Sequence, residues 1–254
     1  MDAVTTSPVI ADGKVFVATS AATVKRFTDA LTPGGLEVTP FGDGVFCSDI
    51  TTPMTVTAGG NLVLACGISQ GMSQIHQIDL VGGTSSYLTT LPSKPAESIV
   101  ILPGGDLVVG TNDGKVHRLA PPPSGGAVPW TDAWNPPPDL GAAVTGVLIA
   151  APDAAGRGAV VYAVTEAGDL HALDAQGATV WTTAGGASAP LGNFSLRFPT
   201  IAPALPGRLP TLYAGSAEGK LYAVVVDTGL DTLSPWPKSH HDIRNTGNAS
   251  AKLP

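Results

Sequence analysis

Charged residues are scarce in this chain of 254 residues, since Asp, Glu, Lys and Arg make up 13% of it. An average soluble domain carries about 25%. The 13 Lys and Arg are outnumbered by 20 Asp and Glu, which gives a formal net charge of −7. Basic side chains cluster only at Lys25-Arg26, a pair too small to form the positive face that releases counterions from phosphates. The sequence therefore predicts no nucleic-acid partner.

Long apolar runs are also missing. The longest run, residues 142–151, is interrupted by Thr145 and Gly146 and is followed by Pro152. It falls short of the roughly 20 apolar residues that cross a bilayer. The segment 1–8 lacks the basic and apolar regions of a secretory signal. We therefore predict no transmembrane segment and no signal peptide in this chain, which implies a cytoplasmic protein or a leader that is missing from the sequence.

Cysteine occurs only twice, at Cys47 and Cys66. Their spacing matches no zinc motif, and two thiolates cannot fill a four-ligand site unless histidines complete it. We interpret the pair as two small buried hydrophobic residues in strands. A disulfide between them is the alternative.

Glycine and proline, by contrast, are abundant, with 31 Gly and 23 Pro. Both residues destabilise helix interiors, so long helices are not expected. Their combined share stays below the roughly 25–30% that marks low-complexity disorder. With 43% hydrophobic residues the chain can bury a core. The sequence predicts a folded, turn-rich, all-β chain, and its length fits a single domain at residues 1–254.

One pattern recurs along the chain: a short apolar run, a polar turn that usually ends in Gly, and a second alternation of apolar residues. The copies begin at residues 15, 62, 107, 161 and 212. This spacing fits the four-stranded blade of a β-propeller, which takes about 40–50 residues. The turns at Asp113-Gly114, Ala167-Gly168 and Glu218-Gly219 place Gly where a tight hairpin needs a positive φ.

We therefore predict a β-propeller of four-stranded antiparallel blades with five recognisable repeats, either closed into a ring or left as an open, truncated arc. The predicted blades span approximately residues 5–46, 47–94, 95–138, 139–190 and 191–235, and a C-terminal tail follows at 236–254. Pro-rich segments at 121–126 and 136–138 fall in the variable outer parts of the blades, where we expect exposed loops.

The repeat resembles that of the bacterial pyrroloquinoline-quinone-like (quinoprotein-like) β-propellers, and residues 158–181 match it best. The tail is similar to a Trp-Pro-x-x-x-His-Asp-x-x-x-Thr-Gly segment found at an end of many secreted or surface-attached propellers of this group. The resemblance implies that the tail is a structural closure motif anchored by a tryptophan. Its residues here are Trp236, His240, His241, Asp242, Asn245, Thr246 and Gly247.

The resemblance also implies a function and a cellular location. It indicates a non-catalytic, monomeric scaffold in the periplasm or at the cell surface, with another protein or a cell-surface ligand as the partner. A quinone-dependent dehydrogenase is one alternative, and a truncated propeller without independent function is another. Enzymes of this group hold the quinone between a Trp and adjacent cysteines beside Ca²⁺, whereas Cys47 and Cys66 are far apart. We therefore predict no catalytic residue, no cofactor and no metal ligand.

Histidines raise two further possibilities. His240, His241 and Asp242 could bind a metal, but neighbouring residues on a strand point to opposite faces, which favours the closure role. Three other histidines occupy equivalent third-strand positions of the repeat, which hold Lys and Tyr in the first and last copies. We expect a partly exposed structural position for all five, His76, His117, His171, Lys25 and Tyr222.

Overall fold

The computed structural model describes residues 3–28, 38–41, 47–50, 52–95, 97, 99–122, 129–152, 158–183, 196–202, 208–242 and 245–251. Within these ranges the chain forms twenty strands and one short 3-10 helix, η1 (Ser69–Gly71). No helix of the described residues has the length and apolar character that crossing a membrane requires.

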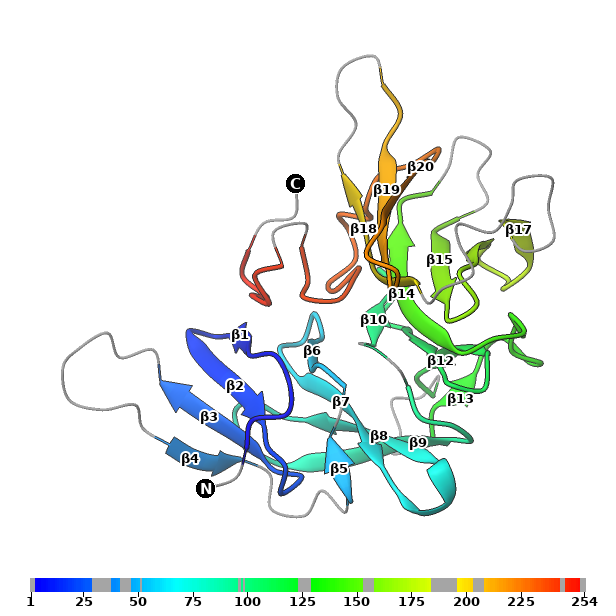
Figure 1. Ribbon diagram of the computed structural model, residues 1–254. Helices are drawn as coiled ribbons and strands as arrows, with labels where there is room; N and C mark the ends of the chain where they lie inside the picture. Colours follow the sequence, from blue (N-terminus) through cyan, green and yellow to red (C-terminus); the bar gives the residue numbers. More distant parts are fainter. Residues whose placement is uncertain are drawn as a thin grey trace.

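The strands form five antiparallel sheets that follow one another along the chain (Figure 1). The first sheet contains β1 (Val9–Ala11), β2 (Lys14–Ala18), β3 (Val24–Thr28) and β4 (Val38–Phe41). The second contains β5 (Asp49–Ile50), β6 (Thr55–Val56), β7 (Leu62–Gly67), β8 (Ser73–Ile78) and β9 (Ser85–Leu91). The third contains β10 (Val100–Ile101), β11 (Leu107–Gly110), β12 (Val116–Ala120) and β13 (Thr131–Asp132). The fourth contains β14 (Val144–Ala150), β15 (Val160–Thr165), β16 (Leu170–Leu173) and β17 (Thr179–Thr182). The fifth contains β18 (Leu196–Ala202), β19 (Thr211–Ser216) and β20 (Leu221–Val225).

This architecture confirms the predicted β-propeller of antiparallel blades. Two sheets depart from four strands: in the second sheet β5 and β6 both pair with β7, and the fifth sheet has three described strands. Figure 1 shows the sheets arranged around the C-terminal segment, with the first and fifth sheets at the two ends of an arc.

The hairpin turns explain why the repeat needs glycine. Between β11 and β12, the amide of Gly114 donates to the carbonyl of Thr111, and the amide of Thr111 donates to the carbonyl of Lys115. Gly114 has φ +86°, and a Cβ there would lie 3.1 Å from the backbone oxygen of Ala142. Any other residue at this position would meet both backbone strain and a steric clash.

The hydrophobic core lies between neighbouring sheets rather than in one central body. One cluster joins the first three sheets, a second joins the fourth and fifth, and a third lies between the third and fourth. Strands inside the arc, such as β7, β15 and β16, are buried on both faces. This two-sided burial explains their short, nearly continuous apolar runs.

Cys47 and Cys66 form a disulfide, with 5.1 Å between their Cα atoms. Our interpretation of the pair as two unbonded buried residues was wrong, and the alternative is correct. The cause is the pairing of β5 with β7, which places Ile50 opposite Cys66 and draws the segment before β5 alongside β7. A separation of 19 residues does not reveal that pairing in the sequence.

Candidate functional site

The C-terminal segment, residues 226–242 and 245–251, runs along the innermost strands of three sheets. It forms isolated bridges to β14 at Leu230 and Lys238, to β10 at Trp236, and to β1 at Asn248. Backbone amides of those strands donate to the segment, including Ile101 to Trp236 at 2.9 Å. The segment therefore satisfies inner strand edges that would otherwise be open, and it links the first, third and fourth sheets.

Trp236 is the most deeply buried large residue of this segment, with 0% of its surface exposed. It packs in the cluster that joins the first three sheets. Its ring centroid lies 4.9 Å from that of His241. Its indole N–H is buried and has no hydrogen-bond partner within the described residues. The contribution of Trp236 is thus apolar packing rather than polar bonding.

A buried lysine organises the turn after Trp236. The Lys238 ammonium donates to the carbonyls of Ser239 at 2.6 Å and Asp242 at 3.2 Å, and to Asn245 Oδ1 at 2.6 Å. Burial lowers the pKa of Lys238 to about 8. The Asp242 carboxylate accepts from the amide and the hydroxyl of Thr246, at 3.1 and 2.8 Å. Sequence reasoning missed Lys238, because an isolated lysine in a loop is normally an exposed residue.

The same turn contains unusual backbone geometry. His240, His241 and Asn245 have φ values of 60°, 71° and 54°, which non-glycine residues rarely adopt. Gly247 has φ +59°, and a Cβ there would lie 2.8 Å from the carbonyl oxygen of Pro8. Its amide donates to the carbonyl of His240 at 3.0 Å. These contacts hold the turn closed against the first sheet.

The structure therefore brings together the seven residues assigned to the closure motif. The Trp236 ring contacts the His241 ring at a tilted angle, and Asp242 accepts from Thr246. The Lys238 ammonium donates to Asn245, and the Gly247 amide donates to the carbonyl of His240. The two histidines lie in a turn rather than on a strand, so the alternation that we expected between them does not apply. Among the described residues, no group of three or more His, Cys, Asp or Glu is placed to hold a metal ion.

A groove of about 880 Å³ lies beside this segment. Turns of the first two sheets form one side, and residues 232–235, 241 and 249–251 form the other. Val81 and Leu233, which line it, are 93% and 77% exposed. The lining includes the carboxylates of Asp12 and Asp79 and, within the described residues, no Lys or Arg. The groove is thus an accessible surface of mixed polar and apolar residues that carries two exposed apolar side chains and two carboxylates.

A smaller cavity of about 270 Å³ lies on another side of the turn, lined by Pro199, Thr200, Lys238, Ser239, His240 and Asn245. The hydroxyl of Thr200 is buried and has no partner among the described residues. The positive charge of Lys238 also favours the ionised form of the Glu97 carboxyl. Burial raises the pKa of Glu97 to about 7, although the charges of Arg197 and Lys238 oppose the shift.

The three repeat-equivalent histidines, His76, His117 and His171, are buried, so our expectation of a partly exposed position was wrong for them. Their Nδ1 atoms contact outer-strand side chains at Ser85 (3.4 Å), Asp132 (2.8 Å) and Thr182 (3.0 Å). Packing between sheets buries most residues of these strands, which the sequence pattern did not reveal. The histidines thus tie the third strand to the fourth.

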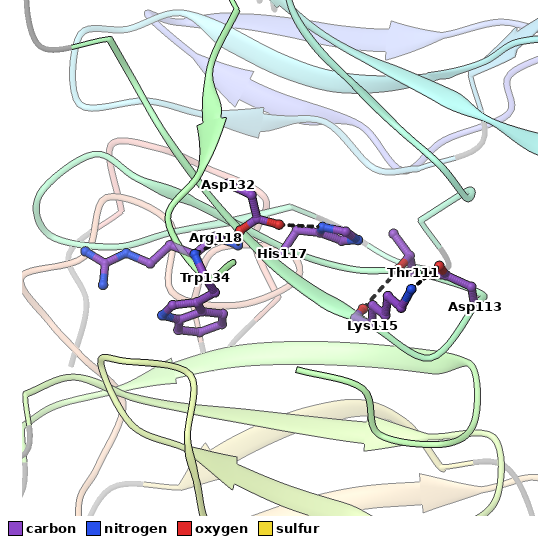
Figure 2. Close-up of polar contacts among 7 residues, drawn as sticks. All are labelled: Thr111, Asp113, Lys115, His117, Arg118, Asp132 and Trp134. Atoms are coloured by element: carbon purple, nitrogen blue, oxygen red, sulfur yellow. Dashed lines mark hydrogen bonds and ion pairs between the residues drawn. The ribbon is translucent and has the colours of Figure 1, made fainter. Parts of the chain in front are cut away.

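Figure 2 shows the His117 ring directed at the carboxylate of Asp132. The other oxygen of Asp132 accepts from the backbone amides of Arg118 and Trp134. The side chains of Arg118 and Trp134 both donate to the carbonyl of Ala175 in the fourth sheet, at 2.7 and 3.0 Å. This cluster is a structural joint between two sheets.

The two cysteines do not match those of the quinone site of the dehydrogenases. The two cysteines of that site are adjacent in sequence, whereas Cys47 and Cys66 are 19 residues apart and bonded to each other across strands. Of the four tryptophans, Trp134 and Trp236 are buried, whereas Trp130 and Trp181 are partly exposed.

Comparisons with known proteins identify the fold. A sequence model described as outer membrane protein assembly factor BamB matches residues 36–247. No curated protein matches the sequence significantly.

Similar solved structures include BamB from Moraxella catarrhalis (TM-score 0.53, 18% identity, covering 87% of this chain and 57% of that one). The WD40 β-propeller domain of Doa1 has TM-score 0.58 and 14% identity, covering 88% of this chain and 65% of that one. A chain of the mitotic checkpoint complex has TM-score 0.53 and 14% identity, covering 88% of this chain and 64% of that one. The chain therefore spans 57–65% of the length of these structures, and at such identities the likeness concerns the fold alone.

Proposed function

Since the chain belongs to the family described as outer membrane protein assembly factor BamB, we propose that it is a non-catalytic β-propeller scaffold that binds another protein outside the cytoplasm. The groove between the first two sheets and the C-terminal segment carries this proposal. Exposed apolar residues gathered in a concave surface are typical of interaction sites. A chain of similar fold lies in the mitotic checkpoint complex, so a propeller of this kind can be part of a protein assembly.

The chemistry of the groove favours an extended protein segment that carries an apolar side chain next to Lys or Arg. Val81 and Leu233 offer apolar contact, and Gly59 and Gly60 leave one wall without side chains, so a backbone can approach closely. Asp12 has an exposed ion pair with Lys14 at 3.4 Å, which is worth little and leaves the carboxylate available. The net charge of −7 adds attraction for a basic partner.

The disulfide between Cys47 and Cys66 supports the extracytoplasmic part of the proposal. Structural disulfides persist in oxidising compartments such as the periplasm and are rare in the cytoplasm. The family description, which names an outer membrane assembly factor, points the same way.

The proposal assigns no catalytic step and no cofactor to the chain. Purified protein mixed with pyrroloquinoline quinone and Ca²⁺ is expected to retain no quinone absorbance after gel filtration. Retained chromophore together with alcohol-dependent dye reduction would support the dehydrogenase alternative instead.

Selection of peptides tests the groove. Peptides selected from a displayed random library on the immobilised protein are expected to share an apolar residue beside Lys or Arg. Fluorescence anisotropy with a selected peptide then measures affinity for the protein and its variants. Leu233→Asp is expected to weaken binding by about tenfold or more, because it places a charge on the apolar contact.

Leu209→Asp is the matched control, since Leu209 is 58% exposed and lies outside the groove. It is expected to leave affinity unchanged. Asp12→Asn is expected to weaken binding mainly at low salt, since ion pairs at exposed sites are screened. Equal affinity of the Leu233→Asp variant and the unaltered protein would refute the groove as the binding site.

A further inference from the structure

The cavity of about 270 Å³ beside the C-terminal turn has mostly polar walls, which come from β18 and from the turn after Trp236. Of its lining side chains within the described residues, only Pro199 is apolar. Lys238 is 2% exposed, whereas Asn245 is exposed. The cavity therefore extends from a buried lysine to an amide side chain that solvent reaches.

The ammonium group of Lys238 supplies this cavity with a positive charge. Its hydrogen bonds go to the carbonyls of Ser239 and Asp242 and to Asn245 Oδ1, all of them uncharged acceptors. A buried cation whose direct partners are uncharged is stabilised by an anion nearby. Because all three ammonium protons are engaged, Lys238 attracts an anion through its charge rather than through a further hydrogen bond.

Two other groups can donate hydrogen bonds to such an anion. The hydroxyl of Thr200 is buried and has no partner among the described residues, which costs free energy unless a ligand or water satisfies it. The oxygen of Asn245 is held by Lys238, so the N–H groups of the same amide point away from the ammonium. The register of β18 shifts between Arg197 and Thr200, an irregularity of the kind that redirects side chains.

We propose that this cavity binds a small organic carboxylate. The carboxylate accepts hydrogen bonds from Thr200 and Asn245 and lies in the field of Lys238, while its carbon chain contacts Pro199. Pockets for drug-sized ligands measure roughly 300–1,000 Å³, so a cavity of about 270 Å³ takes a smaller molecule. The cavity and the groove have no described lining residue in common, and the inference does not depend on the proposed function.

Other occupants fit the cavity less well. A metal cation would be repelled by Lys238, and the described residues place no group of three or more His, Cys, Asp or Glu to hold one. Water satisfies the Thr200 hydroxyl but leaves the charge of Lys238 without a counterion. Inorganic phosphate supplies a counterion but has no carbon chain to contact Pro199.

Succinate is a suitable probe, because succinamide provides an uncharged molecule of nearly the same shape. At millimolar concentration and constant ionic strength, succinate is expected to shift the NMR signals of the Thr200 amide and of the Asn245 side-chain amide to saturation. Succinamide is expected to bind more weakly by about tenfold or more, because it lacks the charge. Shifts that do not saturate would show a cavity filled by water alone and overturn the proposal.

Two comparisons of affinity test the chemical class of the ligand. Equal binding of succinate and succinamide would show that the charge of Lys238 plays no part and overturn the proposal. Tighter binding of inorganic phosphate than of succinate would overturn the assignment of a carboxylate.

The protein variant that tests the site is Asn245→Asp. It keeps an oxygen that accepts from Lys238, and Asp tolerates the φ of 54° at this position, but a negative charge replaces two donors. We expect it to weaken succinate binding by about tenfold or more. Asn248→Asp adds the same charge in the same segment outside the cavity, and this matched control is expected to change affinity little. Equal affinities of the two variants would contradict the site.

Thr200→Val provides a second variant that does not disturb the turn. It removes a hydroxyl that has no partner among the described residues and keeps the shape of the side chain, so the fold is expected to persist. Succinate binding is expected to weaken by about threefold or more, as the loss of one hydrogen bond does. Unchanged affinity would exclude Thr200 as a ligand-binding residue and overturn the proposed geometry.

Two further variants separate the remaining outcomes. Residues 243 and 244 lie outside the described residues, so Arg244→Ala tests whether the chain itself fills the cavity. It is expected not to strengthen succinate binding, and a clear gain in affinity would overturn the proposal. Leu233→Asp in the groove is expected to leave succinate binding unchanged. Loss of peptide binding in the groove and loss of succinate binding can therefore be told apart.

Discussion

At the scale of single residues, the C-terminal turn shows how burial changes what a side chain does. Trp236 contributes an apolar ring, and Lys238 contributes three donors to the turn that follows it. Glu97 lies close enough to Lys238 and Arg197 for their charges to act on its carboxyl. These residues set the local stability of the C-terminal segment, which lines the groove.

Two variants at Trp236 separate the contribution of apolar packing to stability from that of hydrogen bonding. Trp236→Ala is expected to lower the free energy of unfolding by about 3–5 kcal/mol, as other buried Trp truncations do. Trp236→Phe is expected to cost much less, because the indole N–H has no partner among the described residues. Urea unfolding measures both variants. Equal losses for Phe and Ala would show that the indole N–H, and not ring volume, stabilises the segment.

Glu97 is expected to make stability depend on pH. Burial raises the pKa of Glu97 from 4.5 to about 7, so between these values the folded protein holds a proton that the unfolded chain has released. The free energy of unfolding therefore falls as pH rises from about 4.5 to about 7, by up to about 3 kcal/mol. Glu97→Gln is expected to remove this fall. Urea unfolding of both proteins across that range measures the difference, and parallel curves would contradict the assignment.

At the scale of strands and turns, the repeat could be predicted because apolar alternation and hairpin glycines depend on residues that are neighbours in the sequence. Gly114 and Gly168 lie in short turns between apolar alternations, and the hairpins form at those positions. The outer strands and the disulfide were less predictable, since the pairing of β5 with β7 depends on a segment whose sequence has no distinctive alternation. The burial of His117 was missed for a related reason: its cover comes from a neighbouring sheet.

The disulfide is expected to stabilise the second sheet. It closes a loop of 19 residues, for which the chain-entropy account gives about 3 kcal/mol. Thermal unfolding with and without a phosphine reductant measures the effect, and a variant with alanine at both Cys47 and Cys66 is expected to be insensitive to the reductant. Reaction of two thiols with maleimide in the denatured, unreduced protein would show that the bond is absent.

At the scale of the whole molecule, the C-terminal segment links three sheets, of which the first and the fourth share no hydrophobic cluster among the described residues. It bonds to β1, β10 and β14, which belong to three different sheets. The sequence resemblance indicated a closure at the tail, but the route along the innermost strands came from the structure. We propose that this route, rather than pairing between the first and last sheets, holds the arc together.

Removing the segment is expected to release three specific amides. Ile10, Ile101 and Ile149 donate to the carbonyls of Gly247, Trp236 and Pro237. In a chain that ends at residue 229, hydrogen exchange at these amides is expected to accelerate by more than about tenfold, because they lose their acceptors. Amides of β16, which does not bond to the segment, are the internal control. Unchanged exchange at the three isoleucines would contradict the linking role.

The β-propeller, the number of repeats and the positions of the hairpin glycines could be predicted from the sequence, because they depend on apolar alternation and on backbone conformation within a few residues. The sequence also marked the tail residues from Trp236 to Gly247 as a unit. The disulfide, the buried state of His117 and Lys238 and the groove beside the C-terminal segment became known from the three-dimensional structure. Each of these depends on which strand or sheet lies beside a residue, and contacts between distant parts of the chain leave no local pattern in the sequence.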